Sequence, residues 1–170
     1  MDLRSFIRDV PDFPKPGITF KDITPLLKNP GALENVFDLW AKRYRDKKID
    51  VIVAMESRGF IFGAPLANRI GAGFVPVRKP GKLPWKTFSE TYELEYGQDT
   101  LQIHQDALKA GDNVVVIDDV LATGGTAAAT IRLVEKAGGK VVEASFLMEL
   151  MFLNGRQKLK TTPVFSIIQY

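Results

Sequence analysis

Short runs of apolar residues alternate along the chain with longer segments in which apolar side chains recur every three or four positions. Continuous apolar runs of about four to eight residues are typical of strands that are buried on both faces of a sheet. Such runs predict strands at residues 51–54, 74–77 and 113–117, and two apolar-rich stretches that polar residues interrupt, 140–149 and 162–168, predict a fourth and a fifth.

The periodic segments predict helices. The first long helix begins near Pro30, and its apolar stripe consists of Leu33, Val36, Phe37, Trp40 and Tyr44. Further helices are expected at residues 59–71, closed by Gly71 or Gly73, and at residues 125–137. Residues 3–10 carry apolar side chains on one helical face and predict a short helix.

The alternation of strands and helices predicts an α/β fold, with a mostly parallel sheet flanked by helices on both faces. Residues 78–100 interrupt this alternation with two prolines and a run of basic residues followed by acidic ones. We expect this segment to be a hood inserted above the sheet, part loop and part antiparallel ribbon, because long insertions often serve as lids or binding loops. Residues 11–17 are rich in proline and predict a stiff, irregular segment.

Composition narrows the class of protein. The chain has 170 residues, 45% of them apolar and 25% charged, which favours a single soluble domain over residues 1–170. The absence of cysteine excludes a disulfide framework, and one histidine, His104, cannot form a histidine metal cluster. His104 begins the run "HQDAL" and is expected to be a helix-face residue without a chemical role. A net charge of +3 is too small to indicate nucleic acid, and no apolar run is long enough to suggest a membrane span. The N-terminus lacks a signal-peptide core, so a cytoplasmic protein is expected.

Candidate chemistry follows the strand at residues 113–117. Two carboxylates, Asp118 and Asp119, end this run, and the small residues Ala122, Thr123, Gly124, Gly125 and Thr126 precede a helix. Ligands of parallel α/β sheets bind at the carboxyl ends of strands, and the free amides at a helix N-terminus favour a phosphate. The two acids would repel that phosphate, so they are expected to accept hydrogen bonds from sugar hydroxyls or to hold hydrated magnesium.

Acids for a sugar and amides for its phosphate together predict a ribose-5-phosphate site. Two other nucleotide-binding loops are excluded, because the chain has neither G-x-x-x-x-G-K-[ST] nor a G-x-G-x-x-G that follows a strand.

The stretch "VVVIDDVLATGGTAAA" at residues 114–129 resembles the phosphoribosyl pyrophosphate (PRPP) signature of type I phosphoribosyltransferases. Several other stretches resemble the adenine phosphoribosyltransferase family within that group: "PDFPKPGITFKDITPLL" at 11–27, "ESRGFIFG" at 56–63, "VRKPGKLP" at 77–84, "YELEYG" at 92–97 and the terminal "GRQKL…FSIIQY". The resemblance implies the type I phosphoribosyltransferase fold and a role in purine salvage. The implied reaction transfers ribose 5-phosphate from PRPP to N9 of adenine, giving AMP and pyrophosphate, with magnesium bound alongside PRPP in a homodimer.

The resemblance also implies residue roles. The loop from Ala122 to Thr126 would hold the 5′-phosphate, and Asp118 and Asp119 would bind the ribose, with Asp118 contacting magnesium through water at most. The pyrophosphate would be held by Ser57, Arg58, Arg78, Lys79 and Lys82, with Lys82 coming from the partner subunit. A non-proline cis peptide bond is implied near Glu56–Ser57.

The base would be bound by the N-terminal segment at residues 11–27. The resemblance places Thr19, Phe20 and Lys21 around adenine, with Leu150 as an apolar wall. It assigns Glu95 to proton handling at N7 of adenine and Tyr96 to packing over the site as a lid. The sequence pattern alone leaves Glu90, Glu93 and Glu95 open for the proton-handling role, because all three alternate along the same predicted strand.

Two competing functions stay open. A phosphoribosyltransferase for hypoxanthine, guanine or xanthine would carry the same PRPP signature, although residues 11–27 and 92–97 argue against it. A non-catalytic regulator that senses PRPP would keep the fold, but it would need an added nucleic-acid-binding segment or a damaged lid.

Overall fold

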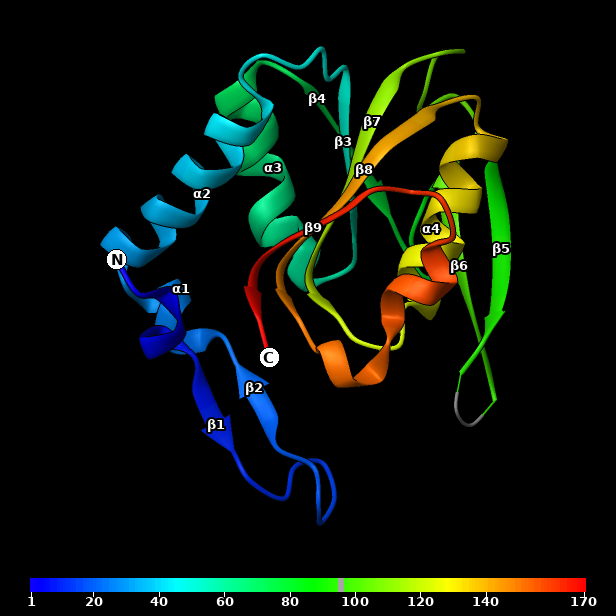
Figure 1. Ribbon diagram of the computed structural model, residues 1–170. Coiled ribbons are helices and arrows are strands. Elements are labelled where there is room, and N and C mark those ends of the chain that lie inside the picture. The colour runs from blue at the N-terminus through cyan, green and yellow to red at the C-terminus, as the bar shows by residue number, and fades with distance from the viewer. Residues whose placement is uncertain (95–96) are drawn as a thin grey trace.

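The computed structural model describes residues 1–94 and 97–170, and it is built around one five-stranded parallel sheet (Figure 1). The strand order across this sheet is β4-β3-β7-β8-β9, and every neighbouring pair is parallel. The strand bounds are β3 Val51–Met55, β4 Gly73–Val77, β7 Asn113–Leu121, β8 Lys140–Glu149 and β9 Val164–Gln169. The predicted α/β fold with a mostly parallel sheet is therefore confirmed.

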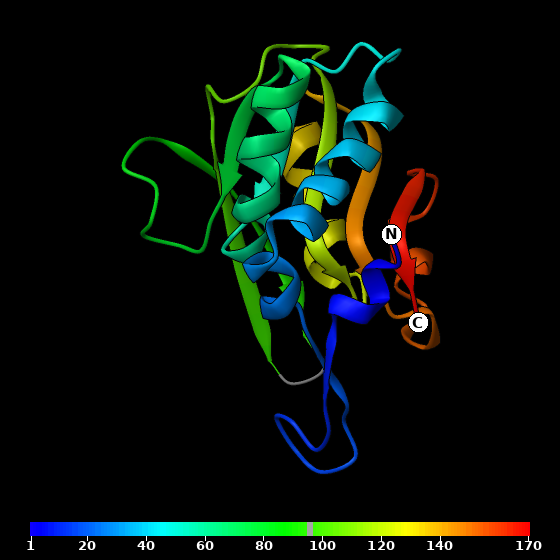
Figure 2. The same ribbon diagram turned by 90° about the vertical axis from the view of Figure 1, so that its left-hand side faces the viewer.

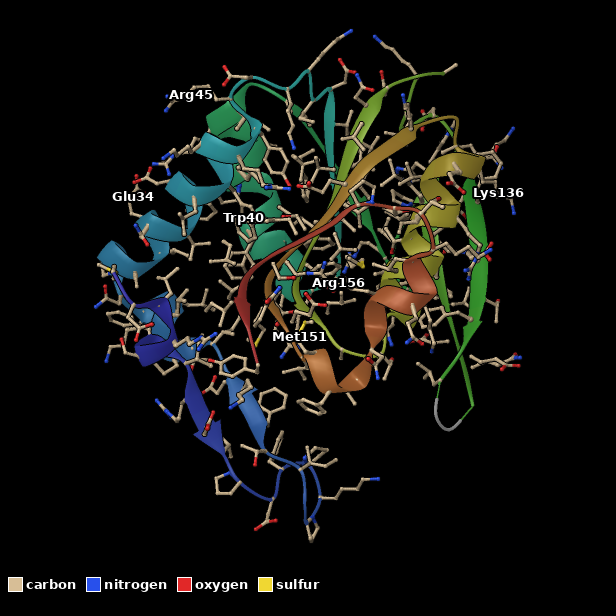
Figure 3. All side chains as sticks on the ribbon, viewed as in Figure 1. Glu34, Trp40, Arg45, Lys136, Met151 and Arg156 are labelled. Atoms are coloured by element: carbon tan, nitrogen blue, oxygen red, sulfur yellow. The ribbon has the colours of Figure 1, made fainter. Side chains whose placement is uncertain are left out.

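Three long helices cover the two faces of the sheet. Helices α2 (Pro30–Tyr44) and α3 (Arg58–Ile70) pack on one face, and α4 (Gly125–Lys136) packs on the other (Figure 1). Alternate residues of β3 and β7 enter the two core clusters, which explains why these strands are apolar throughout. Trp40 projects from α2 toward the sheet (Figure 3), where its indole Nε1 donates to Ser145 Oγ of β8 at 2.8 Å.

The hood segment forms an antiparallel hairpin. Strands β5 (Thr87–Glu93) and β6 (Gln98–His104) pair with each other and pack against α4. The ribbon expected within residues 78–100 is thus present, and it extends four residues further, to His104. The loop between β4 and β5 projects from the body of the molecule (Figure 2). The role of this hood as a lid stays a prediction.

The N-terminal segment differs from the sequence-based expectation. In place of a helix over residues 3–10, a short 3-10 turn, η1 (Leu3–Phe6), is followed by β1 (Arg8–Val10). Strand β1 pairs with β2 (Phe20–Asp22) as a separate hairpin that projects away from the sheet (Figures 1 and 2). The pairing joins residues ten or more positions apart, so local periodicity could not reveal it. The ion pair between Lys21 Nζ and Asp9 Oδ1 at 2.6 Å supports it.

Two further expectations need correction. Strand β7 continues through Asp118 and Asp119 to Leu121, because β8 is long enough to pair with it as far as Glu149. His104 was expected on a helix face, but it ends β6 and pairs with Thr87.

The remaining elements are short, and they are α1 Thr24–Lys28, η2 Met151–Leu153 and η3 Gly155–Leu159. Among the residues described, no helix combines the length and the apolar character needed to cross a membrane.

Candidate active site

A cavity of about 550 Å³ opens at the carboxyl ends of β3 and β7, where ligands of parallel α/β sheets bind. It brings together residues from three segments: the end of β3 and start of α3, the end of β7, and the loop before α4. Its lining consists of Glu56, Ser57, Arg58, Asp118, Asp119, Val120, Leu121, Ala122, Thr123, Gly124, Gly125, Thr126 and Ala127.

The phosphate loop, residues 122–126, wraps the N-terminus of α4. Gly124 has φ +81°, a left-handed conformation that favours glycine, and it caps the helix that begins at Gly125. The first intrahelical bond runs from Ala128 N to Gly124 O, so the amides of Gly125, Thr126 and Ala127 have no acceptor within the helix. Free amides and the helix dipole favour an anion here, and the phosphate site expected at residues 122–126 stays a prediction.

The acid pair, Asp118 and Asp119, lies beside this loop. Asp119 is only 3% exposed, and its Oδ2 lies 2.8 Å from Arg58 Nε. Asp118 is partly exposed to the cavity, and its Oδ1 accepts from the amide of Asp119 at 2.9 Å.

The pKa values of both acids are raised. Loss of surrounding water, reinforced by the charge of Asp119, raises the pKa of Asp118 well above its usual value. Loss of water also raises the pKa of Asp119, although Arg58 opposes the shift. The negative charges of the two carboxylates are therefore incompletely compensated, which suits the pair to hydroxyl donors or to a hydrated cation.

The end of β3 supplies the opposite wall of the cavity. The Glu56–Ser57 peptide bond is cis, as the resemblance implied. Ser57 and Arg58 are exposed at the start of α3 and face the cavity. Gly59 behind them is buried, and an added Cβ there would lie 3.1 Å from Asp118 Oδ1, so the α3 backbone passes close to the acid pair.

The three basic residues of the hood loop do not line the cavity. Arg78 Nε donates to Glu56 Oε2 at 3.0 Å, and the amide of Lys79 donates to Glu56 Oε1 at 2.7 Å. The ammonium group of Lys79 pairs with Asp99 Oδ2 at 2.8 Å. Lys82 is exposed. Glu56 therefore holds the start of the basic loop against the cavity wall.

The residues expected to bind the base do not line the cavity themselves, and they have different surroundings. Phe20 packs edge-on against Phe13, with ring centroids 5.3 Å apart, and the Arg58 guanidinium lies 5.9 Å from the Phe20 centroid. Thr19, just before β2, is exposed. Lys21 donates to Asp9 and lies 4.2 Å above the Tyr170 ring.

Leu150 follows β8, and its amide donates to Leu121 O at 2.9 Å. Phe20 and Leu150 thus each adjoin a residue that lines the cavity, Phe20 through Arg58 and Leu150 through Leu121.

The hood acids are separated by the structure. Glu95 and Tyr96 lie outside the described residues. Glu90 pairs with Arg132 of α4 at 2.6 Å, so it is engaged away from the cavity. Glu93 is exposed near the end of β5. Of the two candidate acids that the structure describes, Glu90 thus has an ion pair elsewhere and Glu93 is exposed.

Sequence reasoning missed a segment that supports the phosphate loop. An added Cβ on Gly155 would lie 2.3 Å from Ala122 O, and one on Gly124 would lie 2.3 Å from Gly155 O, so the two backbones are in direct contact. Arg156, labelled in Figure 3, donates to Glu149 at 2.6 Å from both Nε and Nη2. Hydrogen bonds from Arg156 lower the pKa of Glu149. The sequence offered only the glycine in "NGR" as a signal, because every partner is distant along the chain.

Asp118 and Asp119 are the cavity carboxylates that could contact a hydrated magnesium ion. Across residues 1–94 and 97–170, no group of three or more histidine, cysteine, aspartate or glutamate side chains could hold a metal ion. Two carboxylates with raised pKa values and one arginine can hold a hydrated magnesium ion whose other ligands are phosphate and sugar oxygens.

Known proteins resemble the chain along its whole length. A family model described as the phosphoribosyl transferase domain matches residues 22–167. A protein named adenine phosphoribosyltransferase from Roseiflexus sp. (strain RS-1) is 59% identical over 169 residues, which cover 99% of this chain and 98% of the relative.

Two solved structures are similar in fold. The crystal structure of adenine phosphoribosyltransferase from Thermoanaerobacter pseudethanolicus has a TM-score of 0.96 and 54% identity, and the match covers 99% of this chain and 98% of that one. The Saccharomyces cerevisiae adenine phosphoribosyltransferase, complexed with adenine and D-2,5-dideoxy-2,5-imino-altritol 1,6-bisphosphate, has a TM-score of 0.93 and 46% identity. That match covers 98% of this chain and 96% of the yeast chain.

Proposed function

The chain belongs to the adenine phosphoribosyltransferase family, and from this premise we propose that it transfers the 5-phosphoribosyl group of PRPP to N9 of adenine, giving AMP and pyrophosphate in purine salvage. One observation carries the proposal. The same cavity is lined by the helix N-terminus of α4, whose free amides favour an anion, and by the adjacent carboxylates Asp118 and Asp119 at the end of β7.

The proposed roles of the cavity residues follow from their chemistry. The amides and hydroxyls of the phosphate loop hold the 5′-phosphate. Asp118 and Asp119 accept hydrogen bonds from the ribose hydroxyls, and Arg58 orients Asp119 and favours its charged form. Ser57 and Arg58 face the pyrophosphate. Magnesium bound with PRPP neutralises charge on the pyrophosphate oxygens.

Positive charge builds on the ribose ring as pyrophosphate leaves, and the acid pair stabilises that charge. Water must be kept from this centre, because it would hydrolyse PRPP in place of the transfer. The hood at about residues 78–100 serves this purpose in the proposal, with Tyr96 packing over the site. Glu95 handles the proton at N7 of adenine.

The base is held by the N-terminal segment at about residues 11–27. Phe20 stacks against adenine, backbone groups of Thr19 and Lys21 read its edge, and Leu150 closes an apolar wall. Arg78, Lys79 and Lys82 complete the pyrophosphate site, with Lys82 supplied by the partner subunit of a homodimer. The protein acts in the cytoplasm as one domain, residues 1–170, without a nucleic-acid or membrane partner.

An assay of base choice tests the proposed function. The protein is incubated with PRPP and magnesium and, separately, with adenine, hypoxanthine, guanine or xanthine, and the nucleotide formed is identified by chromatography. We expect AMP from adenine at a rate well above any product from the other bases. Product from hypoxanthine, guanine or xanthine alone would overturn the base assignment. PRPP binding without any nucleotide product would favour a PRPP-sensing regulator.

A further inference from the structure

The hairpin β5–β6 connects two groups that the proposed function assigns to opposite ends of PRPP. Asp99 of β6 pairs with the Lys79 ammonium at 2.8 Å. Tyr92, the cross-strand partner of Asp99, places its hydroxyl 3.2 Å from Thr126 Oγ1 in the phosphate loop and 3.5 Å from Asp99 Oδ2. A chain of polar contacts therefore runs from Lys79 through Asp99 and Tyr92 to Thr126.

The middle of this chain is held firmly in place. Tyr92 is 9% exposed, and its ring lies against the start of α4, where an added Cβ on Gly125 would be 3.3 Å from it. Asp99 Oδ1 accepts from the amide of Thr100 at 2.8 Å, which fixes the orientation of the carboxylate. The hydrogen bond from Lys79 lowers the pKa of Asp99, and the bond to Asp99 raises the pKa of Lys79, so both groups are ionised near neutral pH.

Stability alone does not account for these contacts. The Lys79 side chain is 56% exposed, and exposed ion pairs add little to the free energy of unfolding. The apolar packing of the Tyr92 ring would be equally good with phenylalanine, so its hydroxyl is not needed for burial. The consequence of this series of contacts is geometric, because the contacts fix the position of Lys79 relative to the phosphate loop.

The number of hydroxyl protons decides which residue donates in the hydrogen bond between Tyr92 and Thr126. A hydroxyl carries one proton, so Thr126 can donate it to a phosphate or to Tyr92, but not to both. When a phosphate oxygen accepts from Thr126, Tyr92 must donate its own single proton to Thr126 for their contact to persist, and it then gives up its longer donation to Asp99 at 3.5 Å. Tyr92 thereby orients the proton of Thr126 toward the bound phosphate, which phenylalanine could not do.

We propose that Tyr92 and Asp99 are positioning residues for PRPP, with Tyr92 aiming the Thr126 hydroxyl at the 5′-phosphate and Asp99 holding Lys79 at the pyrophosphate end. The inference rests on the proposed function and adds to it two residues that do not themselves line the cavity. It predicts effects on PRPP that are absent for adenine, because the chain of contacts ends at the phosphate loop and does not reach β2.

Steady-state kinetics of Tyr92→Phe test the first part. We expect the KM for PRPP to rise about fivefold, the value of one ordinary hydrogen bond, with the KM for adenine and the melting temperature nearly unchanged. Thr91→Val is the matched control. It removes a cross-strand hydroxyl contact in the same hairpin, from Thr91 Oγ1 to Thr100 Oγ1 at 2.9 Å, and is expected to leave the KM for PRPP unchanged.

A double-mutant cycle of Lys79→Met and Asp99→Asn tests the second part and does not depend on Tyr92→Phe being well folded. If Asp99 positions Lys79, the loss caused by Lys79→Met will be smaller in the Asp99→Asn background by more than about twofold. Additive effects in the cycle, together with an unchanged KM for PRPP in Tyr92→Phe, would overturn this inference. They would leave the proposed function in place, provided that the wild-type protein makes AMP. A wild-type protein that makes no AMP would overturn the proposed function and this inference with it.

Discussion

Replacing Gly155 with alanine tests whether backbone packing against the phosphate loop sets the affinity for PRPP. The added Cβ would lie 2.3 Å from Ala122 O and 3.1 Å from Gly124 N. Real Cβ atoms essentially never come within 3.0 Å of another heavy atom, so the two backbones must separate by at least about 0.7 Å. The φ of Gly155 lies outside the left-handed range, so this contact is the main cost of the substitution.

The size of the effect follows from that displacement. A misplacement of about 1 Å in groups that position a substrate costs up to about 100-fold in rate. We therefore expect kcat/KM for PRPP to fall by about 10- to 100-fold, equivalent to about 1.4–2.7 kcal/mol. Overpacking a tight contact also lowers the free energy of unfolding by about 1–3 kcal/mol.

The assay measures kcat and KM with each substrate varied in turn, together with the thermal midpoint. Gly31→Ala is the control, since its Cβ would meet Asn29 Oδ1 at 3.5 Å, an ordinary contact, within helix α2. The control is expected to keep wild-type kinetics and stability. If Gly155→Ala is folded and its kcat/KM for PRPP stays within twofold of wild type, the proposed support of the phosphate loop by residue 155 is refuted.

Four further predictions concern acidic residues. Asp119→Asn is expected to weaken PRPP binding or turnover by at least about tenfold, and unchanged steady-state kinetics would contradict its ribose contact. Glu95→Gln should slow turnover far more than it weakens PRPP binding, and near-wild-type turnover would remove Glu95 from the chemistry. Because the folded-state pKa of Asp118 is raised, the stability it contributes is present below its usual pKa of 3.8 and is lost as pH rises through the folded value. Asp118→Asn should therefore melt higher than wild type at pH 7 and equally at pH 3, and equal melting curves at pH 7 would contradict the shift. The pKa of Glu149 is lowered by its hydrogen bonds from Arg156, so its stabilisation is present above 4.5 and is lost as pH falls through the folded pKa. Glu149→Gln should lower the free energy of unfolding at pH 7 by about 1–2 kcal/mol, a reduced value because Arg156 is partly exposed, and the loss should shrink in acid when unfolding is followed by urea titration.

The parts of the fold that were predictable are those whose physical cause is local. The buried strands are continuous apolar runs, and the long helix from Pro30 carries its stripe within four turns. The acid pair and the phosphate loop are likewise contiguous, from Asp118 to Thr126, so their chemistry could be inferred from one stretch.

The features that escaped prediction depend on contacts between distant residues. The pairing of β1 with β2 is decided by partners on another segment, and it overrode the weak helical periodicity of residues 3–10. Gly155 contacts the phosphate loop across more than 30 positions, and Tyr92 reaches Thr126 across 34. A single sequence contains no local signal for such encounters.

The hairpin that carries Phe20 and Lys21 forms a sheet of its own and is fastened to the body partly by the end of the chain. Arg4 Nη2 donates to Gln169 O at 2.8 Å, and Lys21 lies over the Tyr170 ring. In the proposed function, one segment of the chain thus selects the base, and other segments bind the sugar phosphate. Natural selection, or a protein engineer, could exchange the hairpin to change which base is accepted while the phosphoribosyl machinery stays as it is.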